Sequence, residues 1–175
     1  MATLTEMFSQ SVQVIRVPTE TNFNRFEDEG NFASAMVFMG GAMLAFTAAG
    51  FYFSGSTGAV QHLLIALVYY FGFWGLAFLL GRPMGGEATW HELAYTHALF
   101  MAPMLLGFTI SSVAFFSFGY LQVASMYLTF VFLGISLYYS VRCIQGTMNF
   151  YDPVKVLALI AGLLITSVVV YQLYV

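Results

Sequence analysis

The sequence predicts an all-α polytopic membrane protein, a bundle of five transmembrane helices preceded by an N-terminal interfacial amphipathic helix. Of its 175 residues, 60% are hydrophobic and only 7% are charged, against about 25% charged in an ordinary soluble domain. The charged residues fall within residues 6–29, 82–92 and 142–155, and long apolar runs occupy the rest of the chain. These proportions exclude a protein that is solvated on all sides.

Residues 1–31 are predicted to be a cytoplasmic amphipathic helix and its linker. Pro18 would end the helix, and the polar residues after it lead into the first apolar run. One side of the helix is apolar and the opposite side is polar, so it either docks against the protein's own loops or lies in the headgroup layer. The expected membrane-interface residues are Leu4, Met7, Phe8, Val12 and Ile15.

Residues 32–175 are predicted to form a domain of five transmembrane helices. A helix needs about 20 residues to cross a hydrocarbon core roughly 30 Å thick. Since lipid offers no hydrogen-bond partner to the backbone, unbroken apolar runs of that length are expected to cross as helices. The short connection at residues 54–58 makes the first two an antiparallel pair. The spans are expected at about 33–53, 59–81, 93–117, 121–141 and 154–175.

The basic residues predict the orientation of this domain. In the five-span layout all of them lie on the side that holds the N-terminus, and the positive-inside rule assigns that side to the cytoplasm. The C-terminus is then on the opposite side. A net charge of −3 without a basic cluster argues against binding of nucleic acid, which leaves the lipid bilayer, other membrane proteins or further copies as partners. The basic residues are Arg16, Arg25, Arg82, Arg142 and Lys155.

Small residues and one proline predict how the helices pack. Helices in lipid associate through close packing, which small residues at a spacing of three or four permit. Pro103, inside the third span, removes a backbone hydrogen bond and should kink the helix, which frees the carbonyl near Leu99. The expected packing residues are Gly41, Ala45, Ala49, Gly72 and Gly75.

Few residues offer chemistry. The polar residues concentrate between Glu87 and His97, but His91 and His97 are six positions apart and do not share a helix face, so no metal site is expected. The sequence has no GxSxG, HExxH or Walker motif, so we expect no enzyme. We interpret Trp90 and Tyr95 as interfacial aromatic residues.

A cofactor enters only under an alternative hypothesis. His97 lies about one turn inside the third span and is most simply a histidine hydrogen-bonded to a neighbouring helix. His62, near the outer end of the second span, is most simply an interfacial side chain. Either could instead ligate a chlorophyll-type pigment or haem, in an accessory transmembrane subunit of a larger photosynthetic or respiratory complex.

The layout resembles the Yip-domain family of five-span membrane proteins, the Ypt-interacting proteins and their prokaryotic relatives. The similar segments are GGEATWHELAYTHALFMAPMLLG, which carries Pro103, and DPVKVLALIAGLL, which carries Lys155. The chain lacks the long N-terminal region and the acidic-Leu-x-Gly-Pro motif expected of eukaryotic members, so the prokaryotic type fits better. The resemblance implies a cofactor-free, non-enzymatic protein that organises or shapes membranes, or recruits partners at its cytoplasmic face.

Overall fold

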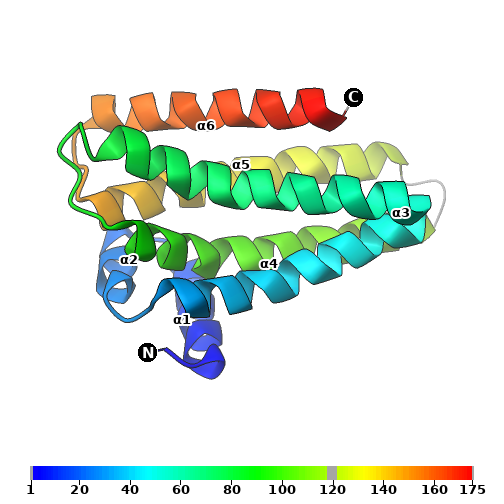
Figure 1. Ribbon diagram of the computed structural model, residues 1–175, viewed down its shortest axis with the longest axis horizontal. Coiled ribbons are helices and arrows are strands. Elements are labelled where there is room, and N and C mark those ends of the chain that lie inside the picture. Colours follow the sequence, from blue (N-terminus) through cyan, green and yellow to red (C-terminus); the bar gives the residue numbers. More distant parts are fainter. Residues whose placement is uncertain (1, 118–121, 175) are drawn as a thin grey trace.

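The computed structural model describes residues 2–117 and 122–174, apart from the side chains at 115–116, 122–126, 129, 163 and 166–174. Every regular element in these ranges is a helix, which confirms the all-α prediction; the span ends expected at residues 121 and 175 lie outside them. The long helices run side by side, and α1 lies across one end of them (Figure 1). The helices are α1 (Leu4–Arg16), α2 (Glu20–Glu27), α3 (Phe32–Gly81), α4 (Trp90–Ser117), α5 (Gln122–Met148) and α6 (Pro153–Tyr174).

Helix α3 is a hairpin of two helical arms, residues 32–53 and 56–81. The chain reverses at Ser54 and Gly55, whose dihedral angles are not helical, and Gly55 has a φ of 63° that favours glycine. The arms meet beside this turn at Gly50 and Gly58. The turn thus takes two residues rather than the predicted five, and the second arm begins three residues earlier than expected.

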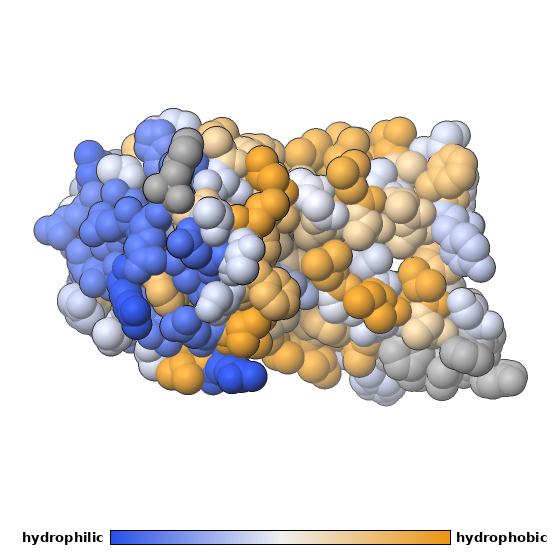
Figure 2. Space-filling view, turned by 90° about the horizontal axis from the view of Figure 1, so that it is seen from below, coloured by the Kyte–Doolittle hydropathy of each residue, from blue (hydrophilic) through white to orange (hydrophobic). Residues whose placement is uncertain are grey.

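Among the described residues, two helices are long and apolar enough to cross a membrane by length and composition, Phe32–Gly81 and Trp90–Ala114. A shorter apolar helix covers Pro153–Gly162. Hydrophilic residues gather at one end of the molecule, and hydrophobic residues cover most of the remaining face in view (Figure 2). The hydrophilic end is the one that carries α1, α2 and the 82–89 loop (Figure 1).

Helix α4 is the centre of the bundle. Every residue from 93 to 100 is buried, because α3 and α5 flank this segment and α1 and α2 also pack against it. A helix enclosed on all sides needs an apolar surface all round, and this segment carries few polar side chains. Tyr70 on α3 links the neighbouring helix to it, since its hydroxyl donates a 2.9 Å hydrogen bond to the Ala94 carbonyl.

The small residues pack differently from the prediction. Ala49 is buried, while Ala45 and Gly72 are only partly buried. A Cβ added at Gly41 or Gly75 would meet no atom within 4 Å, so neither glycine makes a close helix contact. Of the five predicted packing residues only Ala49 is buried, because four-residue spacing does not say which side of a helix meets a neighbour.

The contact at the α3 turn predicts a strong effect of a small substitution. In Gly50→Ala the new Cβ would lie 2.5 Å from the Gly58 carbonyl oxygen and 2.6 Å from the His62 ring. We expect a loss of roughly 1–3 kcal/mol, as for other overpacked sites, measured as a lower thermal midpoint by circular dichroism in detergent. Gly75→Ala, with open space around its Cβ, is the control and should not lower the midpoint. Equal midpoints for the two variants would contradict the close approach.

Candidate functional site at the polar end of the bundle

Helix α1 begins with a complete capping box. The Thr3 backbone N–H donates to the Glu6 carboxylate at 2.7 Å, and the Glu6 N–H donates to the Thr3 hydroxyl at 3.3 Å. These bonds satisfy amides that a helix start leaves without partners. The hydrogen bond from the Thr3 N–H also lowers the pKa of Glu6 below its ordinary value. The first turn is therefore fixed, and one side of the helix is buried, at Met7, Gln10, Ser11 and Val14.

Ser11 docks α1 onto the N-terminal half of α4. Pro103 has no backbone N–H, so the carbonyl four residues before it, that of Leu99, lacks its helical donor. The Ser11 hydroxyl donates a hydrogen bond to this carbonyl oxygen, and both residues are buried. The sequence predicted that this carbonyl lacks a helical donor, but not that Ser11 donates to it. An N-terminal helix thus completes the hydrogen bonding of a proline-interrupted helix.

Three further hydrogen bonds hold α1 in place. The Tyr95 hydroxyl donates to the Gln10 side-chain oxygen at 2.5 Å, and the Gln10 side-chain nitrogen donates to Glu29 at 2.5 Å. From α5, the Tyr139 hydroxyl donates to the Ile15 carbonyl at 2.6 Å. Tyr95 is completely buried, so its interpretation as an interfacial residue is wrong. Trp90, 37% exposed, does reach the surface.

The edge of α1 beside the docking side exposes apolar side chains. Leu4 is 54% exposed and Phe8 65% exposed, while Val12 and Ile15 are partly buried. Met7 has no exposed surface, so it belongs to the docking side and not to the predicted membrane-interface face. The two readings of this helix therefore combine: one side docks on the protein, and a narrower apolar edge faces outward.

Helix α2 covers the first part of α4 and the last part of α5. Phe23 and Phe26 are buried, and the Phe23 ring meets the Phe100 ring edge to face at 6.0 Å. A Cβ at Gly146 on α5 would come within 2.9 Å of the Phe23 Cβ, so this glycine makes room for α2. Arg142 binds Glu20 in a 2.6 Å ion pair at the edge of the contact.

An acidic group lies where α2 ends. Burial, and after it the nearby carboxylates of Glu92, Asp28 and Glu87, together raise the pKa of Glu27 to about 7. One Glu27 oxygen accepts a 3.1 Å hydrogen bond from Asn24, and the other is buried without a hydrogen-bond partner. Among the described residues no group of three His, Cys, Asp or Glu side chains is placed to hold a metal ion.

His97 is enclosed by aromatic rings. It is 1% exposed, and its ring stacks on Phe73 with 3.9 Å between centroids and 11° between planes. Neither ring nitrogen has a hydrogen-bond partner, so the expected hydrogen bond to a neighbouring helix is not formed. A tetrapyrrole would need open space beside a ring nitrogen, and both nitrogens are covered by protein atoms. The arrangement does not fit a pigment or haem.

His62 lies beside the hairpin turn of α3. Its Nδ1 is 2.9 Å from the Gly58 carbonyl oxygen, and its ring packs against Phe46 with 4.5 Å between centroids. The residue is partly buried. It therefore joins the two arms of α3.

Sequence reasoning missed the residues that build the docking contact, Gln10, Ser11 and Tyr139. Gln10 and Ser11 lie next to the apolar side of α1. Polar residues are common on an exposed helix, so nothing in the sequence marked this pair as a docking contact. Comparison with known protein families, curated proteins and solved structures finds no match to this chain.

The Ser11 contact can be tested by a double-mutant cycle. Ser11→Ala leaves the buried Leu99 carbonyl without a donor, which costs about 1–3 kcal/mol. We expect a lower thermal midpoint and faster amide hydrogen exchange in α1. In a Pro103→Ala background the helix supplies its own N–H to that carbonyl, so the effect of Ser11→Ala should become much smaller. Ser9→Ala, at an exposed position of the same helix, is the control. Strictly additive effects of the two substitutions would contradict the contact.

The pKa of Glu27 predicts how stability depends on pH. The folded protein holds this proton up to about pH 7, whereas the ordinary pKa is 4.5. The folded state therefore binds more protons in this window, and the free energy of unfolding falls as pH rises through it. Glu27→Gln should melt at a higher temperature than the wild type at about pH 8 and at the same temperature at about pH 4. Asp28→Asn removes a neighbouring charge but leaves the buried carboxyl, so it should keep most of the pH dependence.

Proposed function

We propose that this chain is a non-enzymatic, multi-pass membrane protein that organises or shapes the bilayer through a rigidly held amphipathic helix at its cytoplasmic face. The two arms of α3, with α4, α5 and α6, would be its five spans. Both arms, the 28-residue α4, the 27-residue α5 and the 22-residue α6 reach the length of about 20 residues that a span requires. The hydrophilic end with its basic residues would face the cytoplasm.

The docked position of α1 carries this proposal. Helices that lie on membranes expose an apolar edge parallel to the surface. Helix α1 lies across the bundle at its hydrophilic end (Figure 1), with Leu4 and Phe8 exposed. Its other side is bonded to α4 and α5 through Ser11, Gln10 and Ile15. Helix α1, held to the bundle by these hydrogen bonds, would displace lipid in the cytoplasmic leaflet and keep its own position.

Two further features favour an organising role over catalysis. Several polar side chains around α1 and α2, among them Thr3, Gln10 and Glu20, are engaged in a cap, docking hydrogen bonds and an ion pair. The resemblance to prokaryotic Yip-domain proteins points in the same direction, because that family's layout also pairs an amphipathic segment with five spans. Partners would then be the bilayer itself and membrane proteins beside the bundle.

The depth of α1 in the membrane tests the placement. Cys143 is the single cysteine and is buried, so a fluorophore attaches selectively to an introduced Phe8→Cys or Gln13→Cys. In liposomes, lipid nitroxides near the headgroup should quench the label at position 8 several-fold more than the label at position 13, which is exposed on the polar side. Equal, water-like signals at both positions would contradict the placement.

Vesicle shape tests the function itself. Wild-type protein should tubulate or narrow liposomes, and Phe8→Glu should reduce this activity because a carboxylate is expelled from the apolar boundary. Gln13→Glu is the control and should retain it. Unchanged vesicles with the wild-type protein would overturn the shaping function, even where the depth measurement holds.

A further inference from the structure

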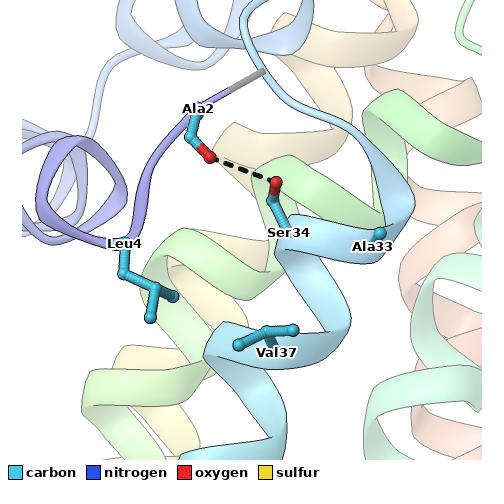
Figure 3. Close-up of a pocket in the computed structure, with 5 residues that line it drawn as sticks. All are labelled: Ala2, Leu4, Ala33, Ser34 and Val37. Carbon is cyan, nitrogen blue, oxygen red and sulfur yellow. Dashed lines mark hydrogen bonds between the residues drawn. The ribbon is translucent and has the colours of Figure 1, made fainter.

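A notch opens between the start of α1 and the first turns of α3 (Figure 3). It has a volume of about 210 Å³ and is lined by Ala2, Leu4, Ala33, Ser34 and Val37. A 3.2 Å hydrogen bond from the Ser34 hydroxyl to the Ala2 carbonyl ties its two sides together. The notch therefore lies at a hydrogen-bonded junction between the start of α1 and α3.

The surface of the notch suits hydrocarbon. Four of its five side chains are purely hydrocarbon, and the hydroxyl of the fifth, Ser34, already has an acceptor. Leu4 and Val37, 54% and 61% exposed, stand on its opposite sides. Water in a notch with hydrocarbon walls makes few hydrogen bonds, so its replacement by an apolar group lowers the free energy.

The notch continues as an open track along α3. Val37 and Gly41 follow Ala33 at four-residue intervals and so share its helix face. A Cβ at Gly41 would meet no atom within 4 Å, and Leu44, one turn further, is 73% exposed. The notch is smaller than the roughly 300–1,000 Å³ of a pocket that encloses a whole small molecule. It can hold one part of a long ligand whose remainder follows this track.

We propose that the notch seats an acyl chain of a membrane phospholipid, with the headgroup beside α1 and the tail along Val37 and Gly41. The inference rests on the proposed membrane placement of the bundle. The occupant follows from continuity: α3 runs from the hydrophilic end, where α1 lies, into the hydrophobic surface (Figures 1 and 2). A lipid is the molecule that presents a polar head and an apolar chain in that order at this boundary. The seated lipid extends the apolar edge of α1 into the leaflet.

Photochemical labelling tests the site. The full-length protein is reconstituted in vesicles of phosphatidylcholine that carries a photoactivatable diazirine in one acyl chain, and the labelled residues are mapped by mass spectrometry. We expect strong labelling at residues 2–4 and 33–37. Val37→Trp fills the notch and should reduce labelling of residues 2–4 by about tenfold, equivalent to roughly 1.4 kcal/mol of lost binding. Leu79→Trp, at another exposed site on α3, is the matched control and should leave that labelling unchanged.

The outcomes separate the site from the membrane placement. Labelling of exposed residues such as Leu44 and Ile110 without enrichment at the notch, or without loss in Val37→Trp, overturns the lipid site alone. An absence of labelling along α3 and α4 overturns the placement and the site together. Labelling of residues 2–4 and 33–37 that is absent at a high protein-to-lipid ratio and appears only on dilution shows that a second copy covers the notch, and overturns the proposal in favour of self-association. If Val37→Trp does not fold, Ala33→Leu narrows the same notch from its exposed side.

Discussion

The hydrogen bond from Ser11 to the Leu99 carbonyl is the interaction on which the polar end of this protein depends. Pro103 interrupts α4 in the middle of the bundle, and a carbonyl left open there would carry the cost of an unpaired buried acceptor. Helix α1 supplies the donor and at the same time buries Met7 and Val14. The N-terminal helix is thus a structural part of the bundle, and its position across the helix ends follows from this contact.

The fixed position of α1 gives its exposed edge a defined direction. An amphipathic segment on a flexible linker can tilt or withdraw, whereas α1 is bonded through Gln10, Ser11 and the Ile15 carbonyl. Leu4 and Phe8 are therefore held outside the bundle, beside the notch between α1 and α3. The two proposed roles, shaping the bilayer and binding a lipid chain, both depend on the position of α1, because a helix that moves away from the lipid displaces none of it.

Other buried polar groups avoid or bear the cost of lost hydration in different ways. The Tyr95 hydroxyl, which the sequence suggested would reach the membrane interface, is buried and bonded to Gln10. His97 has no hydrogen-bond partner and is instead stacked on Phe73. Glu27 lies beside other carboxylates, and burial together with these carboxylates raises its pKa to about 7. Tyr95 and His97 thus place two of the polar groups near the start of α4 inside the packed helices.

Composition and local pattern determined the helical class, most helix bounds to within a few residues, the gathering of charge at one end and the open carbonyl before Pro103, because each depends on residues close in the sequence. They missed α2, which lies in the predicted linker, and the extension of α5 from the expected residue 141 to Met148. Only the tertiary structure decided which residue donates a hydrogen bond to that carbonyl, since Ser11 and Leu99 are far apart along the chain. It also decided which glycines lie in close contact: Gly50 meets Gly58 across the turn, while Gly41 faces open space. The difference has one physical cause. Periodicity shows that a helix has an apolar side, but the direction in which that side points is set by the helices that pack against it.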